Sequence, residues 1–208
     1  MKVVGIYRKC DLVTLLGLIF SITGIVFAYL DNVMFAMIAL ILAAICDAFD
    51  GVVARKHKYT DKQKTYGTEL DSLADVVSFA ILPMLIVISL SKSYIYTYIA
   101  SGIYVVCSVI RLAYFNTLSI TKEDNPKEFI GFPVPTIVFI LPILYFVLTT
   151  IKVNIDYIIY PSLLIVMSLL YILPFKIKKF TTREKIFISV LGILVIGLTI
   201  LKKYLFKY

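Results

Sequence analysis

The chain has 208 residues, of which 61% are hydrophobic and 16% are charged, and its formal net charge is +8. Soluble globular domains average about 45–50% apolar and about 25% charged residues, so this composition excludes an ordinary soluble domain and indicates the bilayer as solvent. The length fits a single domain. The basic residues gather in the gaps between apolar runs, which favours contact with anionic lipid headgroups and argues against nucleic acid as a partner. The three cysteines show no metal-ligand spacing and imply no disulfide.

Seven apolar segments follow one another, each long enough to cross hydrocarbon as a helix. They cover residues 12–30, 33–54, 67–90, 94–117, 133–150, 156–174 and 185–201. Basic residues precede the first segment, but no convincing cleavage site follows it, so we expect an uncleaved span rather than a signal peptide. The predicted fold class is an all-α integral membrane protein, a polytopic helical bundle.

Polar, basic loops are expected at 55–66, 118–131 and 175–184. If the N-terminus faces the cytoplasm, most of the 21 basic residues lie on that side, as the positive-inside rule requires. The sequence therefore predicts a multi-pass protein of the cell membrane. The lysines after residue 201 oppose this bias if 185–201 spans, so an interfacial or re-entrant course for that segment stays open.

Four aspartates interrupt two neighbouring apolar segments. Asp47 and Asp50 lie near the end of 33–54, and Asp71 and Asp75 lie near the start of 67–90. Spacings of three and four residues place each pair on one helix face. The connection between the segments is short, so the helices are expected to be antiparallel neighbours and the two pairs to converge. Charged groups in spanning helices are costly and mark functional sites.

Four converging carboxylates repel one another unless protons or cations neutralise them. An all-oxygen ligand set suits Mg²⁺, Mn²⁺ or Ca²⁺ rather than zinc. Two divalent ions balance four negative charges, and two-metal sites serve displacement at phosphorus. We therefore predict a divalent metal site, with two ions, on Asp47, Asp50, Asp71 and Asp75. The alternative, simple ion pairs with Arg55 and nearby lysines, does not account for two facing pairs.

Gly51, Gly67 and Arg55 flank the aspartates, and each allows two interpretations. The glycines either let helices pack closely or let a ligand approach the backbone. Arg55 either contacts a phosphate through its planar fork or anchors the helix at the interface. We favour the ligand contact in each case.

Together these residues form the pattern Asp47-x-x-Asp50-Gly51-x-x-Ala54-Arg55, then eleven residues, then Gly67-x-x-x-Asp71-x-x-x-Asp75. This pattern resembles the signature of the CDP-alcohol phosphotransferase family. The resemblance implies a homodimeric enzyme with six core spans, to which 185–201 would add a seventh. It also implies a CDP-linked lipid donor, release of CMP, metal on the first three aspartates, and Asp75 as the general base. Asp71 and Asp75 would both touch a second metal.

The resemblance further implies that the donor's cytidine lies near Asp47, Gly51 and Ala54. Arg55 and Gly67, interpreted above as ligand contacts, complete this set of predicted donor-binding residues. Thr14, near the start of the first segment, and Lys64 and Thr65, just before Gly67, are additional candidates. The one histidine, His57, lies in the basic loop outside the signature and is expected to be solvated rather than catalytic.

Three stretches are similar to the phosphatidylserine synthase branch of that family: LDSLADVVSF at 70–79, RLAYFN at 111–116 and GFPVP at 131–135. This similarity implies L-serine as the acceptor, and CDP-diacylglycerol or an archaeal ether-lipid analogue as the donor. Arg111 is then expected to pair with the serine carboxylate, unless it snorkels to the interface, and Asn116 to orient the acceptor.

Two alternatives stay open. Glycerol-3-phosphate or inositol phosphate could replace serine as acceptor, although a phosphorylated acceptor should require a denser basic pocket. An ion-coupled transporter would also use intramembrane carboxylates, but its site would be expected near the bilayer midplane, often between repeats. Here the acids lie toward one end of their segments, and we find no internal repeat.

Overall fold

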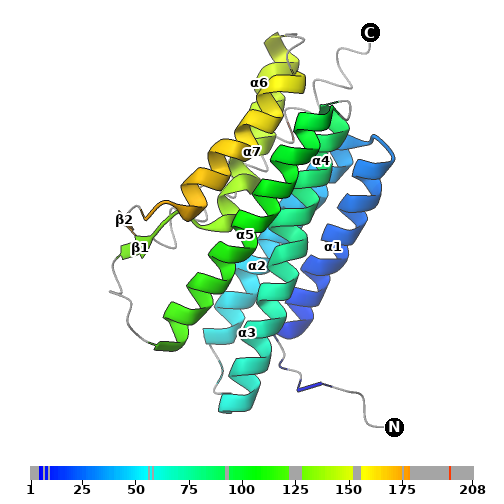
Figure 1. Ribbon diagram of the computed structural model, residues 1–208. Coiled ribbons are helices and arrows are strands. Elements are labelled where there is room, and N and C mark those ends of the chain that lie inside the picture. Colours follow the sequence, from blue (N-terminus) through cyan, green and yellow to red (C-terminus); the bar gives the residue numbers. More distant parts are fainter. Residues whose placement is uncertain are drawn as a thin grey trace.

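The computed structural model describes residues 5, 6, 8, 10–55, 57, 59–91, 94–121, 128–151, 156–174, 176–178 and 197. The described helices are α1 (Asp11–Tyr29), α2 (Val33–Arg55), α3 (Asp61–Asp75), the π-helical segment η1 (Val76–Ile81), α4 (Leu82–Leu90), α5 (Ile95–Thr121), the short 3₁₀ turn η2 (Val134–Thr136), α6 (Ile137–Ile151) and α7 (Asp156–Ile172). Two three-residue strands, β1 (Glu128–Ile130) and β2 (Lys176–Lys178), complete the described elements (Figure 1).

Within the described residues, five helical stretches are long and apolar enough to cross a membrane: Asp11–Tyr29, Val33–Ala54, Asp61–Leu90, Ile95–Thr117 and Val134–Ile151. A sixth apolar helix, Asp156–Ile172, is shorter. The prediction of a polytopic helical bundle is confirmed at this level. The predicted seventh segment, 185–201, lies outside the described residues except for Gly197.

Two of the predicted loops, 55–66 and 118–131, contain helical residues that the sequence did not predict. Helix α3 starts at Asp61 rather than near Gly67, and Thr60 caps it: the Thr60 hydroxyl accepts from the Gln63 amide, and the Gln63 side chain accepts from the Thr60 amide. This capping box is a helix-start signal that hydrophobicity alone does not reveal. Helix α5 likewise runs on to Thr121, inside the predicted 118–131 loop.

Besides the helices, the structure contains a short two-stranded ribbon that the sequence did not predict. Strands β1 and β2 pair antiparallel, with Glu128 opposite Lys178 and Ile130 opposite Lys176. The pairing joins the two loops predicted at 118–131 and 175–184, which are far apart in sequence. Periodicity could not predict this ribbon, because each strand is only three residues long.

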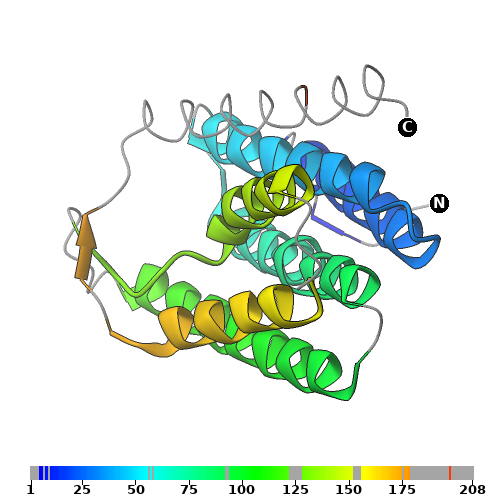
Figure 2. The same cartoon turned by 90° about the horizontal axis from the view of Figure 1, so that it is seen from above.

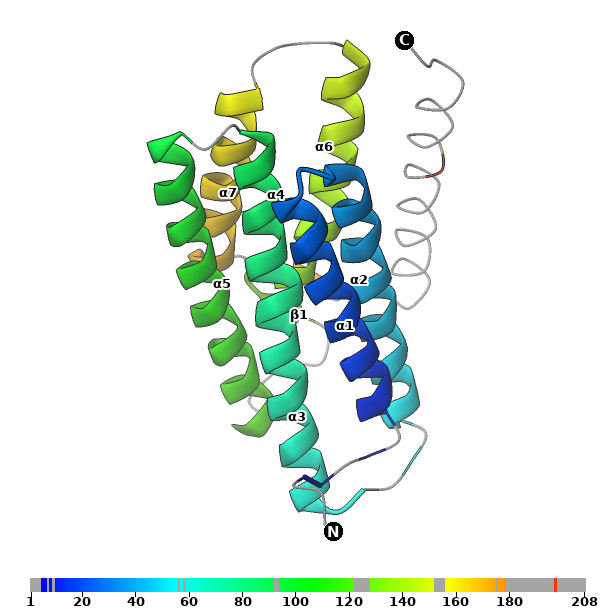
Figure 3. The same cartoon turned by 90° about the vertical axis from the view of Figure 1, so that its right-hand side faces the viewer.

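The helices form two rows with a pair of rods between them. Figure 2 shows α1 and α2 along one side and α5 and α7 along the other, with the continuous α3–η1–α4 rod and α6 between. Figure 3 shows that α1 begins, α2 ends, α3 begins and α5 ends toward the same end of the bundle. We call this end the acid end, because Asp47, Asp50, Asp71 and Asp75 lie toward it.

Helix α1 is polar and small on its buried face and apolar on its exposed face. Its buried residues are Asp11, Thr14, Gly17, Ser21, Gly24 and Ala28. A Cβ added at Gly17 would lie 3.0 Å from the Cβ of Cys46, and one added at Gly24 would lie 2.9 Å from the Cβ of Ala39. The glycines therefore let α1 approach α2 closely, as small residues do between membrane helices.

The large apolar side chains pack elsewhere, in a core contributed mainly by α2, η1, α4, α5, α6 and α7. Its fully buried members include Leu40, Phe79, Leu82, Ile86, Tyr104, Ile137, Leu141 and Leu164. The Tyr104 hydroxyl donates to the carbonyl oxygen of Phe79, 2.6 Å away, within η1. A π-helical segment departs from the usual hydrogen-bond ladder, so this tyrosine stabilises the rod where its winding changes.

Candidate active site

Three of the four predicted metal ligands come together at the acid end. Asp47 near the end of α2 and Asp71 and Asp75 of α3 each offer a carboxylate oxygen, and these atoms all lie within 4.8 Å of one another. The arrangement follows from the sequence spacing, because the antiparallel α2 and α3 turn their acidic faces together. The fourth aspartate, Asp50, is outside this group and only 6% exposed.

Asp50 lies one turn further along α2, in a pocket next to the carboxylate cluster. The pocket has a volume of about 160 Å³ and is lined by Arg8, Cys10, Thr14, Asp50, Gly51, Ala54, Gly67, Thr68 and Asp71. Asp71 belongs to both the pocket and the cluster, so the two adjoin. Several other residues predicted to bind donor or metal share this cavity with Asp71: Thr14, Asp50, Gly51, Ala54 and Gly67.

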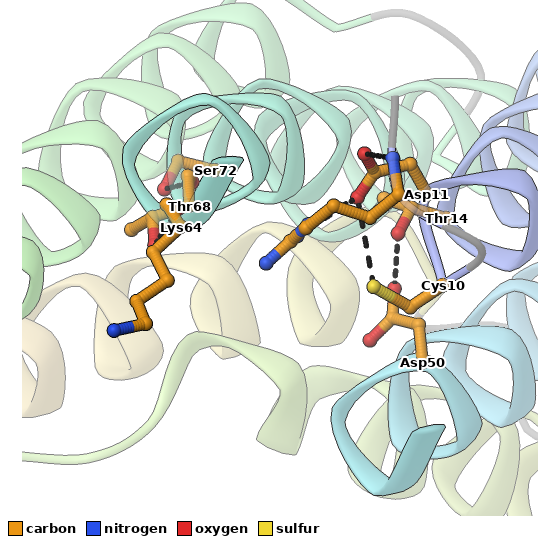
Figure 4. Close-up of polar contacts among 8 residues, drawn as sticks. Cys10, Asp11, Thr14, Asp50, Lys64, Thr68 and Ser72 are labelled. Carbon is orange, nitrogen blue, oxygen red and sulfur yellow. Dashed lines mark hydrogen bonds and ion pairs between the residues drawn. The ribbon is translucent and has the colours of Figure 1, made fainter. Parts of the chain in front are cut away.

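Thr14 orients Asp50 across the α1–α2 interface. The Thr14 hydroxyl donates to a carboxylate oxygen of Asp50 at a distance of 2.5 Å (Figure 4). Both side chains are buried, so this hydrogen bond holds Asp50 at the pocket wall. Thr14 is thus a positioning residue for a signature aspartate.

Arg8, just before α1, and Asp11, its first residue, form an ion pair that was not predicted from the sequence. Asp11 is fully buried, and its Oδ1 accepts from Nε of Arg8 at 2.9 Å and lies 2.8 Å from Nη2 of the same arginine. Its Oδ2 accepts from the Arg8 backbone amide at 2.7 Å. Burial lowers the pKa of Arg8, but the hydrogen bond and charge of Asp11 outweigh it and raise that pKa, so Arg8 remains a cation.

Two of the predicted donor residues point away from the pocket. Lys64 is exposed and pairs with the exposed Asp61 at 3.1 Å, and the Thr65 hydroxyl donates to the Asp61 carbonyl. Figure 4 shows Lys64 extending away from Cys10 and Asp50. Thr68, one turn further along α3, lines the pocket in their place. The side chain of Arg55, and with it the role predicted for this residue, lies outside the described part of the chain.

The two predicted acceptor residues come from the later turns of α5. Asn116 donates through Nδ2 to the Ser72 hydroxyl at 2.5 Å, which places it beside α3 next to Asp71. Arg111 is 5% exposed and donates to two backbone carbonyls, from Nε to Phe132 at 3.0 Å and from Nη2 to Gly131 at 3.2 Å. Arg111 is therefore buried in the protein and does not snorkel to the interface.

Arg111 thereby fixes the chain segment that leads into α6. Gly131 has a φ of +80°, and a Cβ there would lie 3.3 Å from Nε of Arg111, so only glycine fits without strain. The segment is also tied to α7, because the Tyr171 hydroxyl donates to the Val134 carbonyl at 2.9 Å. The GFPVP stretch is thus held against α5 and α7 near Arg111.

The donor set of the cluster fits a hard divalent cation. It consists of carboxylate oxygens, which Mg²⁺, Mn²⁺ and Ca²⁺ prefer. Asp71 Oδ1 is buried and has no hydrogen-bond partner among the described residues. A buried carboxylate oxygen without a partner is costly, and a cation shared with Asp47 and Asp75 would satisfy it.

Arg8, Asp11, Thr68 and Ser72 belong to the site or its surroundings but were not predicted from sequence. Asp11 carried a usable signal, because it is a charged residue at the very start of an apolar run. Arg8 had no such signal, since a basic residue before a first span is the ordinary mark of topology.

The fold and site define a polytopic helical membrane protein with a carboxylate cluster and an adjoining pocket at one end of its bundle. The sequence model of one family, CDP-alcohol phosphatidyltransferase, matches residues 9–173. The chain belongs to this family. The match covers α1 to α7 and every residue of the Asp47–Asp75 signature.

Curated relatives support the same assignment. The chain is 38% identical over 125 residues to a CDP-diacylglycerol–serine O-phosphatidyltransferase of Methanocaldococcus jannaschii, covering 60% of this chain and 54% of the relative. It is 35% identical over 129 residues to the protein of that name from Mycobacterium bovis, covering 59% and 43%. It is 31% identical over 135 residues to an archaetidylserine synthase of Methanothermobacter thermautotrophicus, covering 64% and 56%. The matched region therefore spans about half the length of these relatives.

Proposed function

We propose that this protein is a CDP-diacylglycerol–serine O-phosphatidyltransferase, which transfers a phosphatidyl group, or its archaeal ether-lipid counterpart, from a CDP-activated lipid to the hydroxyl of L-serine. The oxygen–phosphorus bond to serine forms, the bond between the lipid-side phosphorus and CMP breaks, and CMP leaves. The observation that carries the proposal is the meeting of Asp47, Asp71 and Asp75 beside a pocket lined by signature residues. The names of the curated relatives support serine as acceptor.

In this proposal the pocket binds the nucleotide part of the donor. Gly51 and Ala54 present small surfaces on α2, so a planar base or ribose can approach the backbone, and Gly67 lines the same pocket from α3. Thr14 holds Asp50 at the wall through its 2.5 Å hydrogen bond. The diphosphate then lies toward Asp71, where pocket and carboxylate cluster adjoin.

Asp47, Asp50, Asp71 and Asp75 would hold divalent metal, magnesium or manganese, as two ions. Bound there, the metal would neutralise diphosphate charge and stabilise the departing CMP. Asp75 would accept the proton of the serine hydroxyl, because a neutral alcohol is a weak nucleophile without a positioned base. Asp75 is clustered with Asp71, which lines the pocket, and this supports a position for the base near the lipid-side phosphorus.

The acceptor would enter from the side of α5. Arg111 would supply a buried cation for the serine carboxylate. Its Nε and Nη2 also donate hydrogen bonds to the backbone carbonyls of Phe132 and Gly131. Asn116 would orient the acceptor from beside Ser72. The positive-inside bias of the sequence supports a site that opens to the cytoplasm, and the family resemblance supports a homodimer.

The test is CMP release by the purified protein in detergent, with CDP-diacylglycerol, L-serine and Mg²⁺ or Mn²⁺. We expect turnover that requires both serine and metal and that stops when the metal is chelated. Glycerol-3-phosphate and inositol phosphate, offered separately, are the controls for the acceptor. Turnover with one of them and none with serine would replace the acceptor but keep the chemistry. Absence of CMP release with any alcohol would overturn the proposal.

A further inference from the structure

Arg8 lies in the donor pocket although it is outside the family signature. It comes from the segment that precedes α1, and it is the one cation among the described residues that line the pocket. The other charged lining residues are Asp50 and Asp71. A diphosphate entering this pocket would therefore meet two carboxylates and a single arginine.

The guanidinium of Arg8 lies directly against the backbone of Gly67. A Cβ built at Gly67 would overlap Nη2, Cζ and Nε of Arg8. In this structure, the group that lies close to the Gly67 backbone is therefore the Arg8 guanidinium. A larger residue at position 67 would push the guanidinium off this surface.

Two further contacts fix the orientation of Arg8. Asp11 Oδ1 engages Nε and Nη2 on one side, and the Tyr59 ring centroid lies 5.4 Å from Cζ. A guanidinium has five N–H donors in a rigid planar fork. Within the described part of the chain, the contacts with Asp11 use Nε and Nη2, which leaves the Nη1 donors for a ligand.

This arrangement is what a phosphate contact requires. A cation that is already oriented loses little rotamer freedom when it binds an anion. Asp11 is fully buried and balances the charge of Arg8 in the absence of ligand. Its side-chain contacts use Nε and Nη2 of Arg8 and do not occupy the Nη1 donors. Tyr59 belongs to the α2–α3 connection, so Arg8 also joins the N-terminal segment to the two signature helices.

We propose that Arg8 is a donor-binding residue, whose guanidinium, held by Asp11 against Gly67 and Tyr59, hydrogen-bonds a phosphate of the nucleotide donor. The proposal rests on the proposed function in that the donor is a CDP-linked lipid. It assigns to the segment before α1 a direct part in the site, whereas the signature lies wholly on α2 and α3.

The experiment compares three variants of the full-length purified protein: Arg8→Gln, Arg8→Lys and the control Lys62→Gln. Lys62 is an exposed cation on the first turn of α3, so its loss removes the same charge outside the pocket. Binding of CDP in the presence of Mg²⁺ is measured by calorimetry, and the KM values for donor and serine are measured from CMP release. Melting temperature is recorded for each variant, because Arg8→Gln leaves the buried Asp11 without its partner.

We expect Arg8→Gln to weaken CDP binding and raise the donor KM roughly 10- to 100-fold, the range for hydrogen bonds to charged groups, with the serine KM unchanged. Arg8→Lys keeps the charge beside Asp11 but loses the fork, so it should fold normally and still bind CDP several-fold more weakly. Lys62→Gln should match the wild type. If Arg8→Gln does not fold, Arg8→Lys decides the question.

Unchanged CDP affinity in a folded Arg8 variant would overturn the proposal. Tighter CDP binding would overturn it too, since it would mean that Arg8 obstructs the pocket. These outcomes are distinct from failure of the proposed function, in which the wild type itself would neither bind CDP nor release CMP.

Discussion

The acid end and the apolar core of this protein differ in the side chains that they bury. In the apolar core, large side chains such as Leu82, Leu141 and Leu164 are fully buried and fill the space between helices. At the acid end, buried positions are small or charged, as Gly67 and Asp50 are, and the helices leave a cavity of about 160 Å³. Substitutions at the acid end should therefore change turnover and KM values. Substitutions in the packed part of the bundle should mainly change the melting temperature.

The largest effect is expected at the acid end, from Asp75→Asn. The amide cannot accept the serine proton, so turnover should fall roughly 100-fold or more, while CDP binding remains measurable. CMP release and calorimetry with CDP check the two parts. Asp61→Asn, the same change at an exposed position on the first turn of the same helix, is the control. Near-normal turnover of Asp75→Asn would remove this aspartate as the base.

Arg111→Ala should have the next largest effect, and mainly on the acceptor. Loss of the cation should raise the serine KM roughly 10- to 100-fold with a smaller change in the donor KM. Arg111→Lys retains the charge but not the two bonds to the 131–132 carbonyls, so comparing the two variants separates charge from positioning. Equal effects on both substrates would count against a carboxylate contact.

The smallest effect on activity, but a clear one on stability, is expected from Gly24→Leu, away from the acid end. The new Cβ would lie 2.9 Å from the Cβ of Ala39 and 3.0 Å from the Cδ atoms of Leu82, so the α1–α2 contact must open. Overpacking of this kind costs about 1–3 kcal/mol, which should lower the melting temperature while leaving the serine and donor KM values near normal. Thr23→Leu adds similar bulk at the exposed neighbouring position and is the control. An unchanged melting temperature for Gly24→Leu would show that the helices are not closely packed there.

Much of the site could be predicted because its spacing is local. The i, i+3 and i, i+4 spacings within two consecutive helices were enough to bring Asp47, Asp71 and Asp75 together. The separation of Asp50 from this cluster, and its bond to Thr14, could not be predicted in this way, since Asp50 and Thr14 are 36 residues apart. The orientation of Lys64 away from the pocket could not be predicted either. Lys64 is close to Gly67 in sequence, but this proximity does not determine which face of α3 its side chain occupies.

Consecutive residues were enough to specify a polytopic helical membrane protein with convergent acids, because hydropathy and helical periodicity are local properties of the chain. Other features depend on how the helices pack: Arg8 lies on Gly67, Asn116 reaches Ser72, and β1 pairs with β2. Each of these contacts joins segments that are far apart in sequence. Packing selects the partners, and no local pattern encodes that choice.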